Sequence, residues 1–362
     1  VKGPRTCPPS LPEVIAVINR SRTSAREPMS LKIVLPTGGE FLCGFYPSST
    51  CSDICETISK GLTIRGLNES GFALYVNDAK CTNIEVHHSL KEGRLFCDVL
   101  WQWERAVHEV SVGHVKSVSY PRLYFLRRLR FAKSDCDDEV ENILLTCQVT
   151  KAVANGSFHI GSKDDMIAMA AMRSQLEWGN HANLSNPHDK YHQFHRFLPL
   201  KLKYLWFPDE TKSSAAQMFE YSKEKAQLTD AIANKWKLLK TSRPWDLGCD
   251  YIKLASKWEH YGATLFSATD VRAGVERWLA VGERGVSILS HDNVFVNIER
   301  IDYEEFKYFG CLAEEFRLGR KQGAELSFNL VEEGIAAEVA FLISNYLNIL
   351  IRRQGRECRL GE

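Results

Sequence analysis

The chain has 362 residues, which is enough for two or three domains. A composition that is 44% hydrophobic and 25% charged, with eight tryptophans, is typical of a folded globular protein and excludes a disordered chain. The formal net charge of +1 provides no global field that would recruit nucleic acid or an acidic membrane, so we expect no nucleic-acid partner.

The eleven cysteines are scattered along the chain, and none forms a C-x-x-C pair. The chain is also too long to be a small disulfide scaffold, so we predict reduced thiols and a cytoplasmic protein. The longest apolar stretch near the end, residues 335–351, is interrupted by polar side chains and is too polar to span a bilayer.

Residues 1–28 contain five prolines among arginines and serines, which predicts a linker from a preceding domain. Its one apolar run, residues 14–18, is expected to pack on a neighbouring domain. Residues 29–118 begin with a hairpin around Thr37-Gly38-Gly39, and a helix over 50–60 follows, with Thr50 and Asp53 as a capping box. This order of elements predicts a ubiquitin-like lobe.

Residues 119–268 are predicted to form a helical lobe, with Leu123 to Arg128 at its opening. Ser162 and Asp165 are placed as a second capping box, and a long helix is expected over 213–239. Residues 269–362 return to short strands, among them 277–281 and 286–289, and end in one amphipathic helix. That pattern predicts a pleckstrin-homology-like sandwich.

Four segments in this order resemble the FERM family. They are Gly71-Phe72-Ala73-Leu74-Tyr75, then Leu123-Tyr124-Phe125-Leu126-Arg127-Arg128, the stretch 161–179 ending in Gln175-Leu176-Glu177-Trp178-Gly179, and 251–255 leading to Tyr261-Gly262-Ala263-Thr264-Leu265-Phe266. The resemblance implies an α+β fold, the three-lobed FERM cloverleaf. Its lobes would be ubiquitin-like, acyl-CoA-binding-protein-like, and like pleckstrin-homology and phosphotyrosine-binding domains.

The leader Cys7-Pro8-Pro9-Ser10 resembles the join between a myosin-tail-homology domain and a FERM domain. That tandem occurs in unconventional myosins of classes VII, X and XV, in a plant kinesin-like protein and in some pleckstrin-homology adaptors. Of these parents we favour a myosin tail.

The sequence has no glycine-rich nucleotide-binding loop and no nucleophile elbow, so we predict a fragment that is not an enzyme and needs no cofactor, although a myosin parent would be a motor ATPase. His188, His192 and His195 would share one face of a helix and could bind a metal ion, with His181 and Asp189 nearby. The alternative is a solvated surface turn. We favour the surface turn and predict no metal site.

A basic run could attract phosphoinositide headgroups, and its members are Arg122, Arg127, Arg128 and Arg130. The apolar residues between them indicate instead that half of the run belongs to a core, with arginine stems covering apolar surface.

By resemblance, a peptide would bind between an edge strand over 305–311 and the closing helix. The strand residues are Phe306, Lys307, Tyr308, Phe309, Gly310 and Cys311, and the helix residues are Ala336, Val339, Ala340 and Ile343. The alternative for each apolar member is that it simply faces the core.

The resulting hypothesis is a non-catalytic cargo adaptor that binds short cytoplasmic peptides of membrane receptors or adaptors and links them to the cytoskeleton. We expect it in the cytoplasm, at the cytoskeleton or the membrane cortex. The alternative is a phosphoinositide- or filament-binding module of a non-motor cytoskeletal adaptor.

Overall fold

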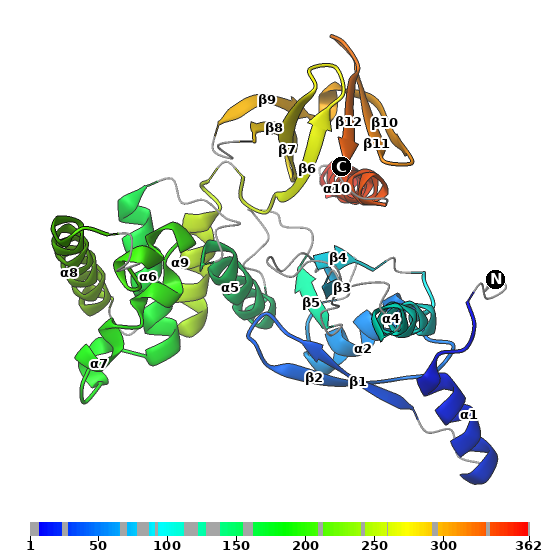
Figure 1. The fold of residues 1–362 in the computed structure, drawn as a ribbon, viewed down its shortest axis with the longest axis horizontal. Coiled ribbons are helices and arrows are strands. Elements are labelled where there is room, and N and C mark those ends of the chain that lie inside the picture. The colour runs from blue at the N-terminus through cyan, green and yellow to red at the C-terminus, as the bar shows by residue number, and fades with distance from the viewer. Residues whose placement is uncertain are drawn as a thin grey trace. The chain divides into compact units, whose positions relative to one another are not determined.

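The computed structural model describes residues 7–23, 28–65, 71–77, 87–90, 93–111, 122–127, 138–154, 162–208, 213–239, 243–258, 260–291, 296–330 and 334–360. The chain forms two compact units, Val1–Arg128 and Leu129–Glu362, and each is described by itself (Figure 1). Within the described ranges, no helix combines the length and apolar content that crossing a membrane requires.

The first unit contains a five-stranded sheet with strand order β2-β1-β5-β3-β4 and a helix, α2, packed against β2 and β3. The expected capping box begins α2, since Thr50 accepts a hydrogen bond from the Asp53 backbone and Asp53 accepts one from Thr50. The elements are β1 (Met29–Val34), β2 (Glu40–Phe45), α2 (Cys51–Gly61), β3 (Phe72–Asn77), β4 (His87–Ser89), α4 (Phe96–Ser111) and β5 (Leu123–Arg127).

Strand β5 lies inside this sheet, parallel to β1 and antiparallel to β3. The predicted boundary after residue 118 is therefore wrong, because it would remove a central strand from the ubiquitin-like lobe. The segment does not open the helical lobe. Burial alternates along it, so that Leu123, Phe125 and Arg127 all point into the core.

Residues 11–23, predicted as linker, form helix α1 (Leu11–Thr23). Its first turn is held by two carboxylates: Glu13 accepts from the Ser10 backbone at 2.7 Å, and Glu104 of α4 accepts from the Leu11 backbone at 2.9 Å. Acidic groups stabilise the positive end of a helix. The apolar run on α1 is exposed within this unit, and its packing on a neighbouring domain remains a prediction. Its exposed members are Val14, Ile15, Val17 and Ile18, and Leu11 at the start of the helix is exposed as well.

The second unit begins with a helical lobe, in which α6 packs against α8 and α9, and α5 packs against α9. Of the capping box predicted at Ser162 and Asp165, the half that the structure describes is the hydrogen bond that the Ser162 side chain accepts from the Asp165 backbone. The elements are α5 (Glu139–Ala154), α6 (Lys163–Trp178), η1 (His181–Asn183), α7 (His188–Tyr191), η2 (Phe194–Phe197), η3 (Leu200–Leu205), α8 (Ala215–Leu238) and α9 (Pro244–Ala255).

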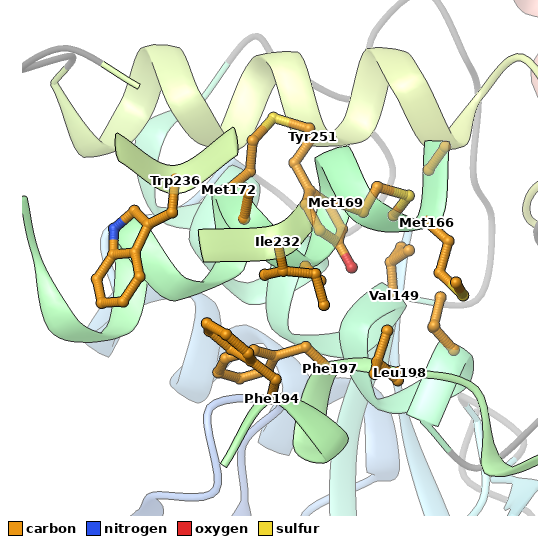
Figure 2. Packing of buried hydrophobic residues seen from close by; sticks show 14 of the residues in the cluster. Val149, Met166, Met169, Met172, Phe194, Phe197, Leu198, Ile232, Trp236 and Tyr251 are labelled. Atoms are coloured by element: carbon orange, nitrogen blue, oxygen red, sulfur yellow. The ribbon is translucent and has the colours of Figure 1, made fainter. Parts of the chain in front are cut away.

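Trp236 of α8 belongs to the helical core and is fully buried (Figure 2). Its indole N–H donates to the Gln175 side chain at 2.9 Å and to the Gly179 carbonyl at 3.1 Å. Gly179 ends α6 with a φ of +82°, a conformation that favours glycine. The segment from Gln175 to Gly179 therefore supplies the hydrogen-bond acceptors for the tryptophan, since a buried indole N–H needs a partner.

A polar seam runs between α5 and α9. Thr150 hydrogen-bonds the Tyr251 hydroxyl at 3.1 Å, and burial raises the pKa of Tyr251 to about 12. Asn142, also fully buried, lies against Gly248, where an added Cβ would come within 2.1 Å of the Asn142 amide oxygen. Glycine at 248 thus lets the two helices approach closely.

The last lobe is a seven-stranded antiparallel sheet with strand order β10-β11-β12-β6-β7-β8-β9, closed by helix α10 (Figure 1). The elements are β6 (Thr264–Asp270), β7 (Val275–Gly282), β8 (Gly285–Ser290), β9 (Asn297–Asp302), η4 (Tyr303–Glu305), β10 (Phe306–Leu312), β11 (Glu315–Arg320), β12 (Leu326–Leu330) and α10 (Ile335–Leu360).

The Tyr261-Gly262-…-Phe266 segment joins the two cores of this unit. Tyr261 belongs to the helical core and Phe266 to the sheet core, with Gly262 turning between them at a φ of +76°. Because β6 already begins at Thr264, the predicted lobe boundary after residue 268 falls inside a strand and is wrong.

Replacing Gly248 by alanine should lower the free energy of unfolding by about 1–3 kcal/mol through overpacking, although alanine is the better helix former. Chemical denaturation measures this. The double variant Gly248→Ala with Asn142→Ala should recover part of the loss, because it removes the amide that the new methyl group meets. Equal stability of Gly248→Ala and the parent would contradict the close helix approach.

Candidate functional site: an edge strand beside a helix

Strand β10 is an edge of the seven-stranded sheet, where β11 is its one partner among the described strands, and helix α10 packs against its inner face. An edge strand presents backbone N–H and C=O groups that an extended peptide can use as a template. The strand expected from the sequence to bind a peptide is therefore an edge strand with the closing helix beside it.

The β10–β11 hairpin determines which backbone groups point outward. Its two-residue turn, Ala313-Glu314, has a φ of +51° at Ala313 and is closed by the pair Leu312 and Glu315. A two-residue turn is closed by a hydrogen-bonded pair, and such pairs alternate along an antiparallel ladder. Gly310 therefore bonds to Arg317 of β11, whereas the N–H and C=O of Phe309 and Cys311 point away from the sheet.

The inner side of β10 carries two half-buried aromatic rings. The ring centroids of Phe306 and Phe309 lie 6.1 Å apart in an edge-to-face arrangement, and those of Phe306 and Tyr303 lie 5.3 Å apart. A register shift at Lys307 separates Phe306 and Phe309 by three residues while keeping both on the inner side. These rings provide an apolar floor beside the outward-pointing backbone groups.

Tyr308 lies on the opposite, outer face. It is opposite Gly319 in the ladder, and its ring occupies the space above that glycine, where a Cβ would clash. Its hydroxyl donates to Glu325 at 2.6 Å, and this hydrogen bond raises the pKa of Tyr308. Tyr308 thus stabilises the hairpin from outside and does not line a trough next to α10.

Three of the four predicted helix residues, Ala336, Val339 and Ile343, are completely buried against the sheet. A peptide could reach them only by displacing α10, so their assignment as groove wall is wrong and the core alternative holds for them. Ala340 is half-buried at the margin of the same core. On the strand, Lys307 and Cys311 are exposed and Gly310 is partly buried.

The arginines of the basic run that was predicted to bind lipid headgroups differ in their exposure to solvent. Arg122 is exposed, but Arg127 is only 2% exposed because it shares the inner face of β5 with Leu123 and Phe125. A headgroup could not contact Arg127 without opening the sheet, so that assignment is wrong. Arg128 and Arg130 lie outside the described residues.

The histidines do not share one helical face, because α7 ends at Tyr191. His181 hydrogen-bonds the Tyr191 hydroxyl at 2.9 Å, and desolvation, with Lys237 and His188 nearby, lowers the pKa of His181. His195 bonds the His192 carbonyl. Within the part of the chain that the structure describes, no group of three or more His, Cys, Asp or Glu side chains could hold a metal ion.

Two family models match the chain. A FERM central domain matches residues 132–266, and an RA-like domain matches residues 27–129, a range that includes β5. The uncharacterized protein CG43867 of Drosophila melanogaster is 24% identical over 366 residues, covering 96% of this chain and 19% of the relative. The chain therefore spans about a fifth of that relative's length.

Solved structures with the same fold include FERM domains from three proteins. The MyTH4-FERM MF2 domain of Dictyostelium discoideum myosin VII has a TM-score of 0.71 at 19% identity, covering 94% of this chain and 63% of its own. The human myosin 7b MyTH4-FERM domain, solved with the harmonin-a PDZ3 domain, has a TM-score of 0.68 at 16% identity, covering 96% of this chain and 65% of its own. The FERM domain of Drosophila Merlin, in complex with its C-terminal domain, has a TM-score of 0.68 at 12% identity, covering 91% of this chain and 98% of its own.

The outward direction of the Cys311 N–H can be tested by proline substitution. Cys311→Pro should change the free energy of unfolding by less than about 1 kcal/mol, because proline is tolerated where an edge N–H faces solvent. Gly310→Pro should cost about 1–3 kcal/mol, because it leaves the Arg317 carbonyl without its donor. Chemical denaturation of both variants measures the difference, and the reverse order would show that the alternation is assigned to the wrong residues.

Proposed function

We propose that this chain, a FERM module of the kind found in myosin tails, is a protein-binding adaptor that captures a short extended peptide along β10. Main-chain hydrogen bonds to Phe309 and Cys311 would hold the peptide backbone, and alternate peptide side chains would lie over the inner or the outer side of the sheet. No chemical step is required of the chain.

The observation that carries this proposal is the free edge of β10 next to a half-buried aromatic surface. Main-chain pairing supplies affinity that is independent of the peptide sequence, while Phe306 and Phe309 favour an apolar side chain at the position above them. We therefore expect a peptide with an apolar anchor flanked by residues that readily adopt an extended conformation.

The biological setting is part of the same proposal. The likeness to myosin VII and myosin 7b MyTH4-FERM domains, one of them solved with a PDZ domain, supports a parent of the unconventional myosin kind that binds protein cargo. The cargo would be the cytoplasmic peptide of a membrane receptor or an adaptor, and the module would work at the cytoskeleton or the membrane cortex of the cytoplasm.

The lipid-binding alternative through the basic run has less support, because burial of Arg127 removes one of its four members from any headgroup. Arg122 is exposed at the start of β5. Arg122, the one exposed member among the described residues of the run, would contribute about 1 kcal/mol near an anionic surface.

A peptide library displayed on phage, built from cytoplasmic segments of membrane proteins, tests the proposal. Selected peptides should bind the parent chain with saturation in isothermal calorimetry, and Cys311→Pro should weaken binding at least about tenfold, since it removes a main-chain donor and obstructs the added strand.

Cys311→Ala is the matched control, because it changes the same side chain and keeps the N–H; its affinity should stay within about twofold of the parent. Peptides that bind the parent and Cys311→Pro equally would locate the binding surface away from the β10 edge. A library that yields no saturable binder would remove the support for peptide capture altogether.

A further inference from the structure

A small pocket lies in the second unit, where the loop after α9 meets the β7–β8 hairpin. Its floor is Ala280, Gly282 and Ser287, and the loop contributes Trp258, His260 and Tyr261. Gly282 is close to Ala263, with 3.4 Å between an added Cβ and the Ala263 side chain, so the loop is held tightly on the hairpin.

The pocket is lined by two arginines from different elements. Arg284 occupies the two-residue turn between Gly282 and Gly285, and no carboxylate among the described residues pairs with it. Arg300 of β9 bonds Asp302 through Nε and Nη2, and no described residue engages its Nη1. Glu283 is the one acidic residue in the lining, and Asp302 pairs with Arg300 from outside it, so Arg284 is the lining guanidinium that no described carboxylate pairs with.

The hydroxyl of a largely buried serine adds a neutral donor. Ser287 of β8 lines the pocket, is 8% exposed, and makes no side-chain hydrogen bond to a described residue. Gly285 keeps the turn against β9, because any Cβ there would lie 2.1 Å from the Ile301 carbonyl oxygen, so the donors are carried on a rigid hairpin.

We propose that this pocket binds a phosphate monoester, with Arg284 and Arg300 as the charged donors and Ser287 as the neutral donor. Guanidinium groups match the geometry of phosphate oxygens and keep their charge at every physiological pH. The phosphate could belong to a soluble small molecule or to a lipid headgroup, and the chemistry recognised in the pocket is the same. The site is separate from β10 and does not rest on peptide capture.

Isothermal calorimetry with inorganic phosphate and with inositol trisphosphate tests the proposal on the full chain. The parent should bind at least one of them with saturation. Arg284→Gln should weaken that binding at least about tenfold, as expected for the loss of a charged hydrogen bond, and Ser287→Ala should weaken it about threefold or more.

Arg272→Gln is the matched control. It removes the same charge from the turn at the opposite end of the β6–β7 hairpin, and affinity should stay within about twofold. Thermal unfolding without ligand confirms that each variant is folded. An equal loss in Arg272→Gln, or no saturable binding by the parent, would overturn the proposal.

A second arm identifies the source of the phosphate. Phosphatidylcholine vesicles containing phosphatidylinositol bisphosphate should co-sediment the parent, but not Arg284→Gln, if the ligand is a headgroup in a membrane. Binding of soluble inositol trisphosphate without co-sedimentation supports a free phosphate monoester. Vesicle binding that persists in Arg284→Gln would place the anionic surface elsewhere and contradict the pocket assignment.

Discussion

An open β-sheet leaves two rows of backbone N–H and C=O groups outside its ladder, and this constraint shapes the last lobe of the chain. Helix α10 covers one face of the sheet with its apolar residues Ala336, Val339 and Ile343. A helix packed on a face cannot form hydrogen bonds with the backbone groups at an edge of the sheet. The edge groups of β10 are therefore available to a partner strand. The turn at Ala313 decides which they are, because it fixes the alternation that leaves Phe309 and Cys311 facing outward.

The other sequence signals that resemble FERM domains serve packing. Gln175 and Gly179 hold the buried indole of Trp236, and Tyr261 and Phe266 belong to two different cores on either side of Gly262. These residues determine that the lobes form, and none of them lies at the candidate site. A family resemblance that rests on them therefore predicts the fold more directly than it predicts a ligand.

Local signals in the sequence predicted local structure well. The capping box at Thr50 forms as expected, and Ser162 accepts one of the two hydrogen bonds of its predicted box, because a capping hydrogen bond depends only on residues a few positions away. The prediction that residues 123–127 open the helical lobe failed because a short strand is defined by its partners, here β1 and β3. In addition, Arg127 occupies a buried position of this strand, and a charged residue there conceals the alternation of apolar and polar side chains.

The candidate site was predictable as a place but not residue by residue. Apolar spacing showed that α10 has one buried face, yet it could not distinguish the centre of that face, where Val339 lies, from its margin, where Ala340 lies. The outward groups of Phe309 and Cys311 also depend on the hairpin closure at Leu312 and Glu315, which requires the observed pairing. The pocket at Arg284 and Ser287 assembles segments that carry no joint signature in the sequence.

Residue-resolved amide hydrogen exchange by NMR, with and without a selected peptide, tests the role of the β10 edge most directly. The amides of Phe309 and Cys311 should exchange fast in the free chain and become protected when the peptide is bound, because they would then donate to the added strand. The amide of Gly310, already bonded within the sheet, should change little. Protection that appears on β9 or elsewhere, with Phe309 and Cys311 unchanged, would contradict strand addition at β10.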